Sequence, residues 1–596
     1  MIFPNKTTCS TARQPQKNNL DMKMIIEYDL TIMPSLTEKI IRGRPYYYLR
    51  ECQRVNGKPK IVWQEYIGTR QQLVQRLTNP VPKEIVVREF GALVAAFDIA
   101  QQLDIVPTID RHVPKRGDQG PSVGEYLLIV CLNRCVSPVS KAKMGEWYDN
   151  TVLPRLLGIK SSQLTSQRFW DNMNRIEEKT IVEIERELAS RVVSRFKLDL
   201  RCLLFDATNF FTFVDSFNDR AKLPQRGKSK EGRENLRILG LALLVTSDGD
   251  IPLFHHTYAG NQHDSVTFGS VSAELADRCR LLGNGVCDVT LVFDKGNNSK
   301  DNLAAVDKGP LYFVGSLVPT QHPDLLAIDR KEMHRLDKTN LPAVWSYRTL
   351  KKVFGIERTV LVTYNRPLYQ AQVKTLRREI RKRKRKLQSL QDSLQRHVQK
   401  PNKGKKPTLE GTSNRVQSIV AGRHMKDLFY AHVTMGKDEI PRLQWRFKDS
   451  EWEKLDRELL GKTILFTDRD DWADDQIVRA YRSQAHVEAA FRRMKDPRFL
   501  TFRPTHHWTD QKLRVHAFYC VLALMILSLI RRKLAQAGIQ RSIARLVERL
   551  AEIREVVTIY PGPEAAPARV QVKLSKHDAE QLAILQILDL SKYCPK

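Results

Sequence analysis

The chain has 596 residues, of which 98 are Lys or Arg and 67 are Asp or Glu, so its formal net charge is +31, and 42% of its residues are hydrophobic. This composition allows several domains with buried cores, and the positive excess indicates a polyanionic partner, either nucleic acid or an anionic membrane surface. The longest apolar run, residues 517–530, argues against a membrane span, because it falls short of the roughly 20 residues that such a helix needs and is bracketed by Arg and Lys. We therefore expect a buried core helix there.

The N-terminal quarter predicts a short tail and a small β unit. Residues 1–24 are polar, and we expect them to be disordered. Residues 25–75 hold two strand-like runs, 46–55 and 60–68, joined by Asn56-Gly57. An Asn-Gly pair between such runs is a strong hairpin signal, so we assign 25–75 to an N-terminal β unit.

Residues 76–197 predict helices, because apolar residues recur every three or four positions. Basic and aromatic residues gather around Ser166, in TSQRFWDNMNRI. Both a DNA-reading helix and a packing helix with a polar face are compatible with that segment, and packing helices are the commoner case. We assign a DNA-binding role to the region.

Residues 198–320 alternate strands and helices. Three strand-like runs come first, the second and third separated by an Asp248-Gly249 turn, which predicts an antiparallel pair. A helix, a strand, a second helix and a fifth strand follow. This order predicts an α/β fold with a mixed five-stranded sheet.

A basic segment, 321–465, interrupts that fold, and we expect it to form an insertion domain before the core resumes at 466–535 and a C-terminal region at 536–596. Within it, residues 370–426 contain 17 Lys or Arg and 3 Asp or Glu. The run is compatible with a solvated charge cluster, but such a density of cations favours phosphate contact. The expected DNA-contacting cations are Arg381, Lys382, Arg383, Lys384, Arg385 and Lys386.

The stretch Gln476–Lys495 predicts one continuous helix, with apolar spacing and no Gly or Pro to break it. Positions seven apart return to nearly the same face, so Tyr481, Glu488 and Lys495 share one stripe. Gln484 and Arg492 lie one turn on either side of Glu488. One acid therefore lies among a Tyr, an amide and two cations.

Two further acids each end an apolar run, Asp206 in RCLLFD and Asp294 in VTLVFD. An Asp at the end of a buried strand projects at the sheet edge, where ligands bind in open α/β sheets, although it can also cap a turn. Together with Glu488 they form a three-carboxylate set of the kind that hard divalent cations require.

These segments resemble bacterial insertion-sequence transposases. The segments FDATNF, SDGDIPLFHHTYAGNQHD, VFDKGNNSKDN and YRSQAHVEAAFRRMK occur in the order found in that family. Its members are DDE enzymes with a ribonuclease-H-like core, a Tyr-Arg-Glu-Lys signature around the Glu, and, in this branch, an insertion between the second Asp and the Glu. The resemblance covers roughly 200–318 and 460–530, so it implies the same interrupted core here.

The resemblance also implies roles for individual residues. Asp206, Asp294 and Glu488 would be the catalytic triad and would hold two Mg²⁺ ions, for which Mn²⁺ can substitute. Tyr481, Gln484, Arg492 and Lys495 would contact DNA. Gln484 stands where the signature has Arg, and it brings no charge and no bidentate fork.

The function implied is transposition: binding of terminal inverted repeats, metal-dependent hydrolysis of the 3′ ends and strand transfer into target DNA. The resemblance further implies a dimer or larger assembly on DNA and a cytoplasmic, nucleoid-associated bacterial protein without membrane contact. Two alternatives fit the same residues, a metal-dependent nuclease that cuts without joining and an inactive DNA-binding protein whose acids are structural.

Overall fold

The computed structural model describes residues 35–55, 57–78, 82–115, 117, 120–282, 288–336, 341–399, 405–503, 505–560 and 569–594. The chain divides into two compact units, one of residues 1–86 and 557–572 and the other of residues 87–556 and 573–596. The expected disordered tail, 1–24, lies outside the described residues.

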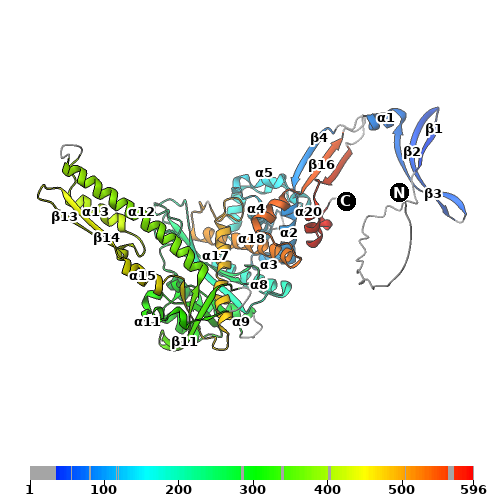
Figure 1. Ribbon diagram of the computed structural model, residues 1–596. Helices are drawn as coiled ribbons and strands as arrows, with labels where there is room; N and C mark the ends of the chain where they lie inside the picture. The colour runs from blue at the N-terminus through cyan, green and yellow to red at the C-terminus, as the bar shows by residue number, and fades with distance from the viewer. Residues whose placement is uncertain are drawn as a thin grey trace, which may run out of the picture. The chain divides into compact units, whose positions relative to one another are not determined.

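The first unit contains an antiparallel sheet of order β1-β2-β3, made of β1 (Ser35–Ile41), β2 (Arg44–Val55) and β3 (Lys58–Thr69) (Figure 1). The two strand-like runs of the sequence lie within β2 and β3, while Asn56 of the expected turn is not described. Tyr48 and Tyr66 pack across the two strands with ring centroids 5.3 Å apart. Helix α1 (Arg70–Thr78) follows β3 directly.

The second unit is organised around a mixed sheet in which nine strands of the described chain pair in the order β10-β11-β12-β15-β9-β8-β5-β6-β7. The mixed α/β class expected from the sequence is confirmed, but the sheet has nine strands and not five. The sheet is larger than expected because strands of the expected insertion continue it: β15 pairs with both β12 and β9. The strand bounds are β5 Cys202–Phe211, β6 Ile238–Thr246, β7 Pro252–Ala259, β8 Thr290–Val292, β9 Tyr312–Ser316, β10 His334–Arg335, β11 Val344–Val353, β12 Ile356–Asn365 and β15 Lys462–Thr467.

Helices cover both faces of this sheet. On one face, Phe205 of β5 packs against Phe268 of α9 (Asp264–Leu282) with ring centroids 5.2 Å apart. Side chains alternate between the faces of a strand, so the residues at 206, 208 and 210 face the other side. There, α16 (Asp474–Arg482) and α17 (Ala485–Met494) contact β9 and β5. The side chain of Asp206 and helix α17, which carries Glu488, therefore lie on the same face of the sheet.

The stretch Gln476–Lys495, predicted to be one helix, is two. Helix α16 ends at Arg482 and α17 begins at Ala485. At the break, the Ser483 hydroxyl donates to the Ala480 carbonyl at 2.5 Å, a local hydrogen bond of the kind that bends helices. The prediction was wrong because no Gly or Pro marks this break.

Helix α18 (Asp510–Gln536) is the central core helix, which confirms the expectation for 517–530. Its length and hydropathy would suit a membrane span, but 94% of its most apolar window is buried inside the protein. It contacts α2 (Gly91–Gln102), α4 (Val123–Val136) and α8 (Glu178–Phe196).

The basic segment forms an arm with a small core of its own. In Figure 1, α12 (Arg366–Gln399) runs away from the sheet, with α13 (Leu409–Val420) and the hairpin of β13 (Phe429–Met435) and β14 (Pro441–Phe447) beside it. The buried residues of this core include Ile380, Leu387, Leu390, Leu394 and Val416. Trp445 packs against this core.

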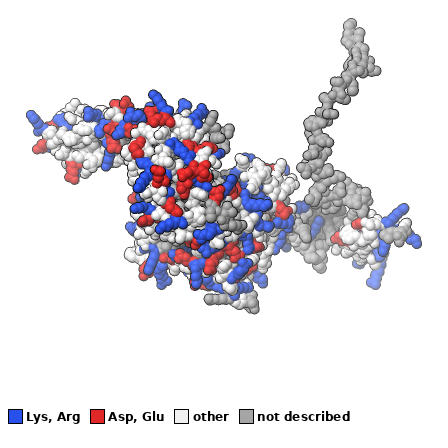
Figure 2. Space-filling model, turned by 90° about the horizontal axis from the view of Figure 1, so that it is seen from below, with Lys and Arg blue, Asp and Glu red and all other residues white. Residues whose placement is uncertain are grey.

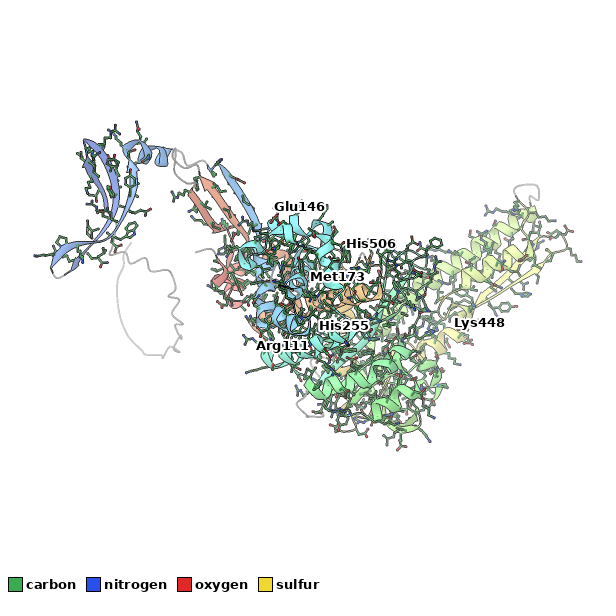
Figure 3. The ribbon with its side chains drawn as sticks, turned by 180° about the vertical axis from the view of Figure 1, so that it is seen from behind. Arg111, Glu146, Met173, His255, Lys448 and His506 are labelled. Atoms are coloured by element: carbon green, nitrogen blue, oxygen red, sulfur yellow. The ribbon has the colours of Figure 1, made fainter. Side chains whose placement is uncertain are left out.

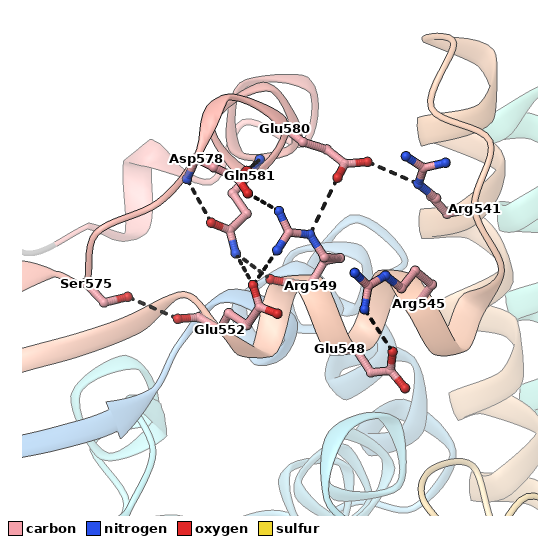
Figure 4. A network of polar contacts seen from close by, with 9 residues as sticks. All are labelled: Arg541, Arg545, Glu548, Arg549, Glu552, Ser575, Asp578, Glu580 and Gln581. Carbon is pink, nitrogen blue, oxygen red and sulfur yellow. Dashed lines mark hydrogen bonds and ion pairs between the residues drawn. The ribbon is translucent and has the colours of Figure 1, made fainter.

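A polar network ties together the helices near the C-terminus (Figure 4). Arg549 of α19 (Ile543–Ala551) pairs with Asp578 and Glu580 at the start of α20 (Ala579–Ile587), and with Glu552.

The remaining elements of the described chain are short helices, strands and 3₁₀ turns. The helices and strands are β4 Glu84–Glu89, α3 Ile105–His112, α5 Met144–Asp149, α6 Leu153–Leu157, α7 Ser166–Met173, α10 Lys300–Asp307, α11 Pro323–Leu326, α14 Met425–Leu428, α15 Asp449–Glu458, β16 Arg554–Tyr560 and β17 Arg569–Leu574. The 3₁₀ turns are η1 Lys141–Lys143, η2 Ser161–Gln163, η3 Lys295–Asn297, η4 Pro319–Gln321, η5 Arg330–Glu332 and η6 Ser591–Tyr593.

Candidate active site

Asp206 and Asp294 occupy matching positions relative to two neighbouring parallel strands, Asp206 within β5 and Asp294 two residues beyond the end of β8. Strands β5 and β8 pair in parallel, and their last partners are Leu204 and Val292. Both Asp residues follow two positions later, and neighbouring strands lie about 4.8 Å apart. The sequence predicted Asp206 at the end of its strand, and this prediction was wrong. Strand β5 continues to Phe211 through its pairing with β6. Asp206 lies where the parallel neighbour ends, which opens the same sheet edge.

Burial raises the pKa of Asp206 to about 6, and the charges of Asp294 and Asp264 add to that effect. Lys230 and the backbone N–H of Ala207 oppose it. The Ala207 N–H donates to Asp206 Oδ1 at 2.8 Å, while Lys230 Nζ donates to the Ala207 carbonyl at 2.6 Å and lies 3.1 Å from Asp264 Oδ2. The ionised form of Asp206 is thus destabilised by burial and by its acidic neighbours, and Lys230 offsets part of that effect.

Asp294 is held by hydroxyl groups. Ser316 of β9 donates from Oγ to Asp294 Oδ1 at 3.2 Å. Tyr481 lies beside the same pair, since its pKa is raised to about 12, mainly by burial, with further effects from Ser316, Asp294 and Glu488. The Tyr481 side chain therefore connects Asp294 with α16, the helix that precedes the one carrying Glu488.

Glu488 is exposed on α17, and its carboxylate makes no hydrogen bond or ion pair with a described residue. The opposite face of α17 is firmly held, by contrast. The buried Asp250, at the turn between β6 and β7, pairs with His486 and, through Oδ2, with Arg493 at 2.6 Å and Arg531 of α18 at 2.8 Å. Asp250 thus fixes the rotation of the helix that presents Glu488.

The donor set suits a hard divalent cation. Three carboxylates supply hard oxygen ligands, and Mg²⁺ takes its remaining ligands from waters and substrate phosphate. The free carboxylate of Glu488 and the raised pKa of Asp206 are both features that a bound cation would relieve. Within the described ranges, however, no group of three or more His, Cys, Asp or Glu is placed so that it could hold a metal ion, so Asp206, Asp294 and Glu488 do not form a closed metal site in this structure.

The other predicted residues of this helix differ in their surroundings. Lys495 donates from Nζ to the Thr208 hydroxyl at 3.0 Å, so it lies two residues along β5 from Asp206. Burial lowers its pKa. The Gln484 amide nitrogen is buried without a hydrogen-bond partner. Arg492 is exposed on α17. The structure thus brings Lys495 to the carboxylates and leaves Gln484 with an unused donor.

The six predicted cations of the basic run lie on α12, in the arm. Arg383 is committed internally, to Glu379 at 2.5 Å and the Ala421 carbonyl at 2.7 Å, and Lys384 lies 4.2 Å from the centre of the Phe447 ring. The other four, together with Arg378, line a surface hollow of about 530 Å³: Arg381, Lys382, Arg385 and Lys386. On the face in Figure 2, Lys and Arg are spread among Asp and Glu without a single continuous patch.

Sequence reasoning missed Lys230, Asp250 and Asp264 as members of the site. Asp264 and Asp250 lie within a motif that carried the resemblance, SDGDIPLFHHTYAGNQHD, but spacing alone does not reveal contacts with β5 or α17. Lys230 lies in an irregular segment with no periodic signal.

Comparison with known proteins gives one family match. A family described as "Transposase DDE domain" matches residues 210–526, which include Asp294 and Glu488 and begin after Asp206. No curated protein matches the chain. A cryo-EM structure described as the piggyBac transposase synaptic complex with hairpin DNA is similar with 10% sequence identity and a TM-score of 0.35, over 79% of this chain and 82% of that chain. So weak a structural likeness supports no inference.

Proposed function

This chain belongs to the DDE transposase domain family, and we propose that it is a bacterial insertion-sequence transposase that hydrolyses the 3′ ends of its element and joins them to target DNA. The observation that carries this proposal is the matched placement of Asp206, within β5, and Asp294, two residues beyond the end of β8, with Glu488 exposed on α17, which packs against β5. Five consecutive strands support a ribonuclease-H-like core, with β7, β6 and β5 antiparallel and β5, β8 and β9 parallel.

Asp206, Asp294 and Glu488 would hold two Mg²⁺ ions, or Mn²⁺ in their place. When bound, such a pair activates a water or 3′-hydroxyl nucleophile and stabilises the leaving oxygen. The residues of the chain prepare this site. Ser316 and Tyr481 orient the Asp294 carboxylate, and Lys230 screens Asp206 from its acidic neighbours.

The phosphates of the DNA end would be held beside these acids. Lys495 supplies a cation next to β5, and Tyr481 a hydroxyl next to Asp294. The unpartnered Gln484 amide can donate a hydrogen bond to a phosphate oxygen, although without the charge that Arg would bring. Arg492 is free to contact DNA from the exposed side of α17.

The cations of α12 would contact DNA away from the cut. Arg381, Lys382, Arg385 and Lys386 share one hollow with no carboxylate in it, which suits a polyanion. We infer that the protein acts on double-stranded DNA as a dimer or larger assembly, so that both element ends are cut together, and that it works at the bacterial nucleoid.

The test is cleavage of a labelled duplex that carries the element's terminal repeat, in Mg²⁺ and in EDTA. Asp206→Ala, Asp294→Ala and Glu488→Ala should each abolish cleavage and retain salt-sensitive DNA binding, whereas Asp301→Ala, an exposed acid on α10, should behave like the wild type. Retained cleavage in two of the three variants would overturn the assignment. A strand-transfer product distinguishes a transposase from a nuclease that only cuts.

A further inference from the structure

A second cavity, of about 520 Å³, lies apart from the three carboxylates. Its wall includes the end of β5, the turn η1, helix α7 and the segment that follows α17. Phe211 belongs to this wall and lies five residues beyond Asp206, which is about 17 Å along the strand. His506, labelled in Figure 3, lies at this wall too. The cavity is large enough for a small ligand, which typically needs at least about 300 Å³.

Lys141 is a buried cation in this wall, and no carboxylate of the described part of the chain pairs with it. Its side chain contacts only polar and aromatic groups: Nζ is 3.3 Å from the Tyr519 hydroxyl, 3.4 Å from His507 Nε2 and 4.4 Å from the centre of the Trp170 ring. The charged groups nearest to it, Arg134 and Lys512, are also cations. Burial, reinforced by these cations, lowers the pKa of Lys141 to about 7. A buried ammonium in such surroundings lacks an anion.

Two further polar groups of the wall are available to a ligand. His507 is buried, and its Nδ1 has no hydrogen-bond partner. Burial holds its pKa well below the ordinary value, so it is neutral and can donate or accept one hydrogen bond. Arg134 donates to the Thr501 carbonyl at 3.4 Å and forms no ion pair with a described residue. These groups converge on the same space as Lys141.

Aromatic rings line the rest of the cavity. Phe213 stacks on His506, with centroids 5.2 Å apart and an angle of 15° between the rings, yet 48% of its surface is exposed. The Arg503 guanidinium lies 4.4 Å from the centre of the Phe211 ring. Exposed flat faces of this kind are suited to stacking against another flat ring, such as a nucleobase.

We propose that this cavity binds one nucleotide, with its phosphate at Lys141 and Arg134 and its base against Phe213 and His506. The ligand chemistry is a nucleoside monophosphate unit, either free or part of a DNA strand. An anion satisfies the unpaired cations, and a flat base covers the exposed rings. Only the DNA source rests on the proposed function, because a free nucleotide would bind whether or not the protein cuts DNA.

The test is a titration of the full-length protein in EDTA, followed by calorimetry, with thymidine 5′-monophosphate, thymidine, inorganic phosphate and a 5′-phosphorylated ten-nucleotide single strand. We expect the monophosphate or the single strand to bind at least about ten-fold more tightly than thymidine or phosphate alone. Tighter binding of the monophosphate identifies a free nucleotide, and tighter binding of the strand identifies DNA. Phosphate that binds as tightly as both overturns the nucleotide assignment.

Matched variants locate the site. Lys141→Met should weaken binding about ten-fold or more, Lys141→Arg should restore part of it, and Lys143→Met, an exposed cation of the same 3₁₀ turn, should leave it unchanged. Phe213→Ala, at a half-exposed position, should weaken nucleotide binding without affecting the binding of phosphate. Equal binding by the wild type and both Lys141 variants would refute the proposal. Asp294→Ala should bind nucleotide normally, so failure of the catalytic assignment is distinguishable.

Discussion

The ammonium group of Lys495 donates a hydrogen bond to the Thr208 hydroxyl, 3.0 Å away. This contact connects the C-terminal end of α17, which carries Glu488, to the strand that carries Asp206. Lys495 is also anchored from behind, because its carbonyl accepts a hydrogen bond from Arg503 at 2.7 Å. The hydrogen bond to Thr208 therefore holds the end of α17 against β5.

Replacing Thr208 with Val tests this connection. Val keeps the size of the buried side chain and removes the hydroxyl, so the fold should survive while α17 loses its link to β5. We expect DNA cleavage to fall by about ten-fold, which corresponds to one lost hydrogen bond to a charged group. Thr212→Val serves as the control, since Thr212 lies one residue beyond the end of β5 and its hydroxyl donates to the Arg237 carbonyl, not to α17. Equal loss in both variants would show that the effect is general destabilisation.

Asp206 predicts an unusual dependence of stability on pH. Its pKa in the folded protein, about 6, lies above the ordinary value of 3.8, so between these two values the folded state binds more protons than the unfolded state. Stability contributed by this group is therefore present below pH 3.8 and lost as the pH rises through 6. Asp206→Asn should consequently raise the free energy of unfolding at pH 8 by up to about 3 kcal/mol.

The measurement is denaturant unfolding of wild type and Asp206→Asn at pH 5 and pH 8, in EDTA and in Mg²⁺. The gain should be larger at pH 8 than at pH 5, and Mg²⁺ should stabilise the wild type more than the variant. A gain that is the same at both pH values would argue against burial of an ionised Asp206. Asp301→Asn, an exposed acid, controls for the change in net charge.

Much of this site was accessible from the sequence, because its acids follow strong local signals. Asp206 and Asp294 come after apolar runs, and parallel pairing of those runs places them side by side. The nine-stranded sheet was not accessible, because β12 and β15 join it by pairings between residues about a hundred positions apart. Contacts such as that of Asp250 with Arg493 escape prediction for the same reason, since they depend on tertiary packing and not on periodicity.

Asp250 holds helix α17 in place through its ion pairs with His486 and Arg493. Burial by itself would raise its pKa, but the hydrogen bond with His486 and the charges of Arg493 and Arg531 bring it below the ordinary value. The backbone of Asp250 has φ of 57°, a left-handed conformation that Asn tolerates, so Asp250→Asn removes the charge with little backbone strain. We expect a loss of about 3 kcal/mol in the free energy of unfolding, because Arg493 and Arg531 are left without their anion.

Asp250→Asn should also lower cleavage more than DNA binding, since α17 loses the contact that sets its rotation. The readout is single-turnover cleavage beside DNA affinity, both at a temperature where the variant is folded. Asp248→Asn is a matched control on the same turn, because Asp248 pairs with Arg532 and touches neither His486 nor Arg493. If Asp248→Asn lowers cleavage as much, the role given to Asp250 is wrong.

The cations of α12 predict the salt dependence of DNA binding. Each Lys or Arg that neutralises a phosphate contributes about 0.9 to the slope of log affinity against log salt concentration. Replacing Arg381, Lys382, Arg385 and Lys386 together with Gln should therefore reduce the slope by about 3 to 4 if all four contact DNA. Arg383→Gln should change it little, because that guanidinium is already bound to Glu379 and the Ala421 carbonyl. Affinity measured on duplex DNA from 50 to 300 mM salt gives both slopes, and an unchanged slope in the fourfold variant would place the DNA elsewhere on the protein.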